Sequence, residues 1–148
     1  MKIRTSLAAA GAAVVLGTTG ALVVPAVASA HSASTTLKFI SVTKGSTMFS
    51  KTSGGQQDTD VNAAGKTVGF DMLYFAVTSA TTANVNVTVA TNGGFLYGTG
   101  TINFKTNAFS NGKVTGGTGS FAGATGTIKA KNLNKPGTRT AVTVTYST

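Results

Sequence analysis

The sequence has 148 residues, a formal net charge of +9 at pH 7, no cysteine and no tryptophan, and only three acidic residues. Without cysteine no disulfide can stabilise the fold, and with a single histidine, His31, neither a metal cluster nor a Ser-His-Asp or Cys-His triad is expected. The basic residues are scattered singly with no aromatic stripe between them, so nucleic-acid binding is not expected either.

The first 30 residues have the pattern of a secretory signal peptide. Two basic residues open the chain, an uncharged apolar run covers residues 7–24, and the small residues 28–30 form a cleavage motif. The run is also just long enough to span a membrane, but Pro25 and the cleavage motif favour removal. We expect an extracellular protein that begins at His31, with no membrane segment after cleavage. Its surplus of basic residues predicts loose association with an anionic cell wall.

The mature chain is expected to be one domain, with a disordered lead-in over residues 31–36 and a β-barrel over residues 37–148. Strand patterns are found in residues 37–42, 68–78, 84–90, 95–104, 128–133 and 140–146. A long polar loop is predicted over residues 44–60 and a turn over residues 107–113. Residues 68–78 are apolar on both faces, which predicts a strand covered on both sides.

Residues 112–126 contain six glycines, a density that excludes a helix and predicts a tight bend between strands. With the segments beside this bend, the chain is expected to form seven or eight strands joined by short turns. The fold class is therefore all-β, either a closed antiparallel barrel or a sandwich.

Residues 114–126, Val-Thr-Gly-Gly-Thr-Gly-Ser-Phe-Ala-Gly-Ala-Thr-Gly, resemble a signature of the allene oxide cyclase and dirigent superfamily. That signature is Gly-Gly-Thr-Gly-x-(Phe/Tyr)-x-x-Ala-(Arg)-Gly, and the resemblance extends over roughly residues 57–148. It implies an eight-stranded antiparallel barrel, commonly trimeric, whose apolar lumen steers cyclisation or coupling of a small molecule without a cofactor. The chain departs from the signature at Thr125, where Arg is common, and at Ser120, where some dirigent members have an acid.

The candidate residues for binding a ligand in the lumen are Asp71, Tyr74, Tyr97, Ser120 and Thr125. Asp71 shares strand parity with apolar neighbours, so burial in a lumen would raise its pKa and suit it to act as an acid. The alternative, which the sequence favours, is a solvated or lysine-paired carboxylate at the barrel rim. For each tyrosine, ordinary barrel packing is the alternative.

Asp58 and Asp60 fall in the predicted polar loop, where local turn hydrogen bonding is their expected role. Glycosidase chemistry would need two of the three acids to converge across a cleft, which is not expected.

The leading functional hypothesis is a secreted barrel that binds a small apolar, aromatic or phenolic metabolite in its lumen. In an enzymatic form it would be a cofactor-free cyclase or isomerase. The alternative is a non-catalytic surface protein that acts by adhesion or assembly. An open lumen lined by tyrosines and Asp71 would favour the first hypothesis, and a lumen plugged by Phe, Val and Ile would favour the second.

Overall fold

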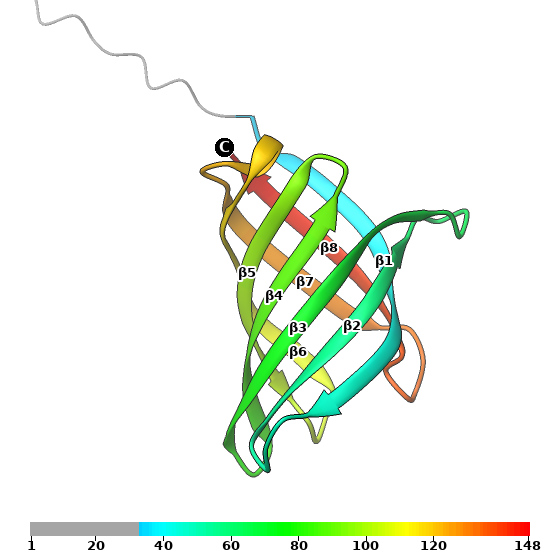
Figure 1. Ribbon diagram of the computed structural model, residues 1–148, viewed down its shortest axis with the longest axis vertical. Helices are drawn as coiled ribbons and strands as arrows, with labels where there is room; N and C mark the ends of the chain where they lie inside the picture. Colours follow the sequence, from blue (N-terminus) through cyan, green and yellow to red (C-terminus); the bar gives the residue numbers. More distant parts are fainter. Residues whose placement is uncertain (1–32) are drawn as a thin grey trace, which may run out of the picture. The chain divides into compact units, whose positions relative to one another are not determined.

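The protein forms a closed antiparallel barrel of eight strands in a computed structural model that describes residues 33–148 (Figure 1). The strands are β1 (Thr35–Met48), β2 (Ser53–Val61), β3 (Thr67–Ser79), β4 (Thr82–Thr91), β5 (Gly94–Asn103), β6 (Ala108–Gly117), β7 (Thr125–Asn132) and β8 (Arg139–Ser147). This confirms the all-β fold class and selects the barrel over the sandwich. The predicted signal peptide lies outside the described residues.

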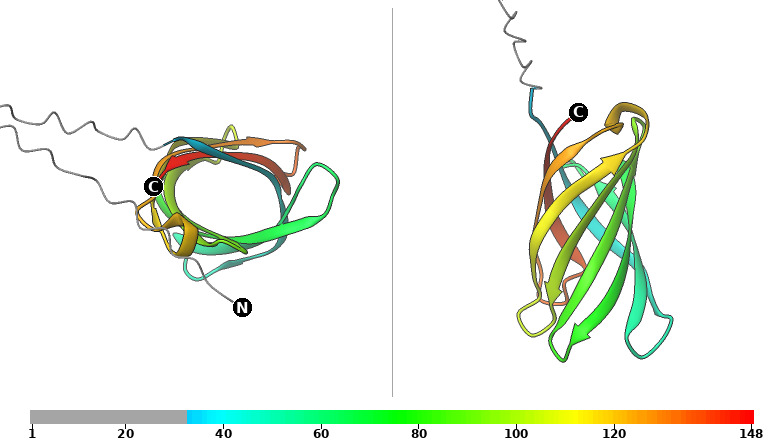
Figure 2. Two further views of the ribbon diagram at one scale, coloured as in Figure 1. Left: turned by 90° about the horizontal axis from the view of Figure 1, so that it is seen from above. Right: turned by 90° about the vertical axis from the view of Figure 1, so that its left-hand side faces the viewer.

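Each strand pairs with the next along the chain, and β8 pairs with β1 to close the barrel. Figure 2 shows this closure in the view along the barrel. Each strand therefore has a neighbour on both sides, although β6 and β7 pair only at Lys113–Thr127 and Val114–Gly126. Within the described residues, the structure contains no helix with the length and apolar character needed to cross a membrane.

One end of the barrel is filled by a hydrophobic core, and the short 3-10 helix η1 (Gly119–Phe121) contributes to it. The core residues are Phe39, Val89, Leu96, Val114, Phe121, Ala124, Ile128 and Val144. Phe121 is 4% exposed and packs edge-on against Tyr146, with ring centroids 5.5 Å apart. Figure 1 places η1, in gold, at the same barrel end as the C-terminus.

Two local predictions were wrong, because polar or glycine residues occupy strand positions that face inward. The polar loop predicted over residues 44–60 is the second half of β1, a short connection and β2. β1 also begins at Thr35, inside the predicted lead-in. The turn predicted over residues 107–113 is largely β6, where Gly112 is needed because a side chain there would meet the backbone of Ile128.

The prediction that residues 68–78 are covered on both faces was also wrong for this chain. The inward face of β3 lines the lumen, but the outward face carries four apolar or aromatic side chains that are 42–57% exposed. These residues are Val68, Phe70, Met72 and Tyr74. A sheet curled into a barrel covers only one face of each strand, so apolar residues on the other face are left at the surface.

Candidate functional site

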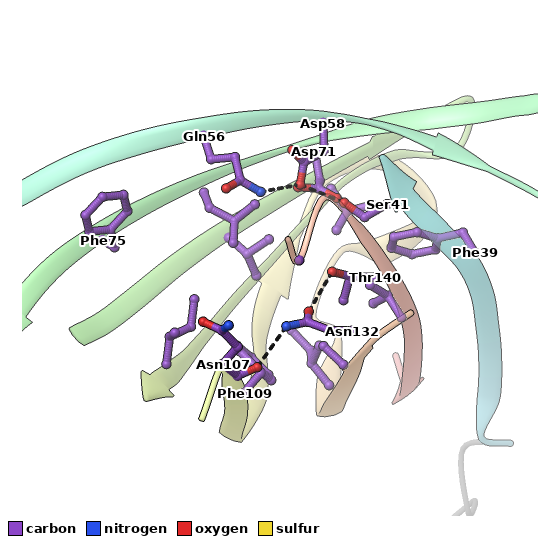
Figure 3. Close-up of a pocket in the computed structure, with 18 of the residues that line it drawn as sticks. Phe39, Ser41, Gln56, Asp58, Asp71, Phe75, Asn107, Phe109, Asn132 and Thr140 are labelled. Carbon is purple, nitrogen blue, oxygen red and sulfur yellow. Dashed lines mark hydrogen bonds between the residues drawn. The ribbon is translucent and has the colours of Figure 1, made fainter. Parts of the chain in front are cut away.

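A cavity of about 270 Å³ lies within the barrel, beside the hydrophobic core and extending away from it. It reaches the barrel end formed by the β5–β6 and β7–β8 connections, where Asn107, Pro136 and Gly137 line it. Figure 3 shows its lining residues coming from strands on all sides of the lumen. The lumen is therefore plugged at one end by Phe, Val and Ile and hollow toward the other.

The walls of this cavity are mainly aliphatic and aromatic. The apolar side chains that line it are Phe39, Leu73, Phe75, Val87, Val89, Ile102, Phe104, Phe109, Ile128, Ala130, Val142 and Val144. Phe75 and Phe104 meet edge to face, with ring centroids 6.3 Å apart. Such walls suit an apolar or aromatic molecule, because transfer of its apolar surface from water into the cavity is favourable.

The only three acidic residues of the chain converge in the lumen. Asp58 on β2 lies directly opposite Asp71 on β3, and Asp60 lies two residues further along the inward face of β2. Their exposed fractions are 5%, 3% and 1% for Asp58, Asp71 and Asp60. Asp58 and Asp71 line the cavity, whereas Asp60 lies behind them. We call these three residues the aspartate cluster.

The hydrogen bonds to the cluster are concentrated on one carboxyl oxygen. Asp58 Oδ2 accepts from Ser41 Oγ at 2.7 Å and from Gln56 Nε2 at 2.8 Å, as Figure 3 shows. Four buried oxygens have no hydrogen-bond donor from the described chain: Asp58 Oδ1, Asp71 Oδ1 and both oxygens of Asp60. A buried carboxyl oxygen without a donor is costly, so the cluster needs protons or a ligand to satisfy it.

Burial of the cluster shifts two pKa values upward. Burial, and after it the neighbouring carboxyls of Asp71 and Asp58, raise the pKa of Asp60 to about 9. Burial, with a contribution from the charge of Asp58, raises the pKa of Asp71 to about 6, and the neighbouring Asp60 carboxyl and Ser41 hydroxyl limit this rise. At neutral pH, Asp60 therefore keeps its proton while Asp71 is largely ionised.

A second polar group lies toward the opposite end of the cavity. Asn132 Nδ2 donates to the backbone oxygen of Asn107 at 3.0 Å, and Thr140 Oγ1 donates to Asn132 Oδ1 at 3.0 Å (Figure 3). These bonds join β7, β8 and the β5–β6 connection. They fix neutral hydrogen-bonding groups at the rim, so the charge that the lumen carries comes from the aspartate cluster.

Of the five candidate residues taken from the sequence, only Asp71 lines the cavity. Its expected place at a solvated rim was wrong, because it is 3% exposed and faces the lumen. Tyr74 and Tyr97 have the opposite strand parity and point outward, 45% and 39% exposed. Ser120 in η1 and Thr125 at the start of β7 are exposed and absent from the cavity lining.

Tyr74 instead borders an outer groove. Its ring stacks on Phe49, with centroids 6.2 Å apart and planes 12° from parallel. Met72, Asn86 and Thr88 also line this groove, which has a volume of about 560 Å³.

Sequence reasoning missed Asp58 and Asp60, although a pattern was present. Gln56, Asp58 and Asp60 alternate with outward residues, which is the period of a strand. The acids lie close together, but they do not converge across a cleft. Asp58 and Asp71 lie on adjacent strands of one wall and do not flank a substrate from two sides, as glycosidase carboxylates do. Within residues 33–148, no group of His, Cys, Asp or Glu is arranged to hold a metal ion.

The fold and the site together define a small closed β-barrel with a hollow, acid-bearing lumen. A comparison with solved structures finds a similar barrel in a protein named pyocyanin demethylase, with a TM-score of 0.58 and 16% sequence identity. The match covers 76% of this chain and 100% of that one. At this identity the likeness supports the fold alone. No protein-family model and no curated protein matches the chain, so the resemblance to the allene oxide cyclase and dirigent superfamily stays a prediction.

Proposed function

We propose that this protein binds a small apolar or aromatic molecule in the lumen of its barrel. The observation that carries the proposal is the cavity of about 270 Å³, with aromatic and aliphatic walls and buried carboxyls at one place. An apolar cavity of about 150 Å³ is sufficient for benzene, so this lumen has room for a two-ring molecule. The similar barrel named pyocyanin demethylase is consistent with a fold that acts on a small molecule.

The same proposal extends to catalysis, in which the protein would convert the molecule that it binds. At neutral pH Asp60 keeps its proton, and Asp71, which lines the cavity, is largely ionised. A carboxyl pair of this kind can accept or donate a proton during an isomerisation or cyclisation without a cofactor. We retain that activity as the enzymatic form of the proposal.

The test fills the lumen with a side chain and measures binding. Ala130 is half-buried and lines the cavity, whereas the adjacent Lys129 is exposed on the outer face of β7. We expect Ala130→Phe to abolish binding of 2-naphthalenemethanol in a calorimetric titration and Lys129→Phe to leave it unchanged. Equal binding by both variants would contradict a lumen site. Native mass spectrometry of protein from its own culture medium would detect a natural ligand as added mass. Recovery of the protein from the medium would itself test secretion.

A second candidate function is assembly, and the outer face of the barrel favours it. Phe70 on β3 pairs through Ala90 with Phe95 on β5, and Met72 pairs through Thr88 with Tyr97. These rows make one apolar face across three strands, and its large side chains are 39–57% exposed. Exposed apolar faces of this kind mark protein interfaces. We propose that copies of the chain associate through it, as in a trimer.

A further inference from the structure

The position of the acids in the lumen carries information about the ligand. The chain has twelve basic residues and three acidic ones, and all three acids lie together inside the barrel. No lysine or arginine lines the cavity. The described surface therefore carries basic side chains without an acidic partner, whereas the lumen has the opposite charge.

Two oxygens of the residues at the cavity wall lack a hydrogen-bond donor. Asp71 Oδ1 and Asp58 Oδ1 are buried, belong to residues that line the cavity, and receive no hydrogen bond from the described chain. Ser41 and Gln56 already donate to the other oxygen of Asp58. A carboxylate only accepts, so the missing partner must be a donor. A donor that also carries positive charge forms the stronger, charge-assisted bond.

Aromatic walls of the same cavity complement such a group. Phe39 and Phe75 line the cavity together with Asp58 and Asp71, and Figure 3 labels all four. Faces of aromatic rings attract a cation, and their bulk buries an apolar body. An anion would instead meet the ionised Asp71, and a neutral molecule would leave two acceptors weakly satisfied.

We propose that the lumen selects a cationic aromatic amine, whose protonated nitrogen donates to Asp71 and Asp58 while its rings pack against the phenylalanine walls. This inference rests on the proposed lumen function and names the chemical class of its ligand. It places Asp71 and Asp58 in contact with the ligand. Asp60 does not line the cavity, and we assign it no contact with the ligand.

The test compares three probes of the same shape in calorimetric titrations of the wild-type protein at pH 7.5 and physiological salt. 2-Naphthylmethylamine is cationic, 2-naphthalenemethanol is neutral and 2-naphthoate is anionic. We expect the amine to bind about 10- to 100-fold more tightly than the alcohol, and the carboxylate more weakly than either. Equal affinities of amine and alcohol, or tightest binding of 2-naphthoate, would overturn the inference while leaving lumen binding intact. Failure of all three probes would overturn the proposed function itself.

A matched pair of variants locates the selectivity. Asp71→Asn raises the net charge by one inside the lumen, and Thr127→Lys raises it by one at an exposed position on β7. We expect the first variant to remove most of the preference for the amine over the alcohol, and the second to retain that preference. Persistence of the full preference in Asp71→Asn would refute the role of Asp71.

A pH series on the wild-type protein tests the role of Asp71 in this preference without a substitution. The titratable groups that face Asp71 are Asp58 and Asp60 on β2, whereas β1 and β4 present Ser41 and Val89. Lowering the pH from 7.5 to 5 protonates Asp71, so the ratio of amine to alcohol affinity should fall severalfold. A ratio that stays constant over this range would count against the inference.

Discussion

Raising the pH from 5 to 8 is expected to destabilise this barrel, because Asp60 binds its proton more tightly in the folded barrel than in the unfolded chain. Its pKa is raised from 3.8 to about 9 by burial and by its neighbouring carboxyls. In the unfolded chain the same carboxyl is ionised throughout this range. Stability from a raised acid pKa is fully present below the unfolded value and is lost as the pH rises toward the folded value.

The magnitude follows from one proton released on unfolding. One proton changes the free energy of unfolding by about 1.4 kcal/mol per pH unit, so the loss between pH 5 and 8 is about 4 kcal/mol. The result is insensitive to the exact pKa of Asp60, provided that it lies above 8. Asp71, with its pKa raised to about 6, steepens the loss below pH 6. A loss of this size is a large part of the roughly 5–15 kcal/mol that stabilises a typical domain.

Urea unfolding followed by far-ultraviolet circular dichroism at pH 5, 6, 7 and 8 measures this effect. We expect Asp60→Asn, whose amide is neutral at every pH, to lose most of the slope above pH 6.5. At pH 8 it should exceed the wild type by about 4 kcal/mol more than it does at pH 5. The background is low because the chain has only three acidic residues and one histidine, and His31→Gln controls for the latter. Wild-type stability that is flat or rises from pH 5 to 8 would refute the reasoning, as would an unchanged slope in Asp60→Asn.

Three further predictions concern the hydrophobic core at one barrel end and the outer apolar face. Phe121→Ala should lower the free energy of unfolding by about 3–5 kcal/mol in urea titrations, because it leaves a hole in the core. Gly119→Ala should be more destabilising than Gly123→Ala in the same assay. Both glycines have positive φ, +58° and +76°, but only at Gly119 would a side chain also meet the backbone of Gly93. Met72→Lys should reduce the assembly mass in light scattering without loss of the barrel's circular dichroism, whereas Thr127→Lys should not.

The barrel could be predicted because most of its inward positions are apolar. Val85 and Val89 on β4 and Val142 and Val144 on β8 alternate with polar residues, and that alternation specifies a half-buried strand. β2 could not be recognised in the same way. Its inward residues are Gly54, Gln56, Asp58 and Asp60, so the alternation is present but the apolar signal is absent.

The site was only partly predictable for the same reason. Parity along β3 placed Asp71 on the face of Leu73 and Phe75, which is correct. It could not show that Asp58 lies opposite Asp71, because pairing between β2 and β3 depends on a register that includes an irregularity between Asp60 and Val61. The tyrosines were misplaced because aromatic residues are common on both faces of a strand. Tyr74 and Tyr97 lie on the outer face.

The aspartate cluster is difficult to explain as part of the folding design. The barrel has no disulfide, and replacing Asp60 by a neutral side chain is expected to stabilise it at neutral pH. Buried, mutually repelling carboxyls reduce stability wherever they occur, and proteins retain such groups mainly at sites where their chemistry is used. Asp58 and Asp71 border the cavity, where a bound donor would offset their burial. Binding of a cation should therefore stabilise the barrel most at pH 8, where the ionised carboxyl of Asp71 most needs a partner.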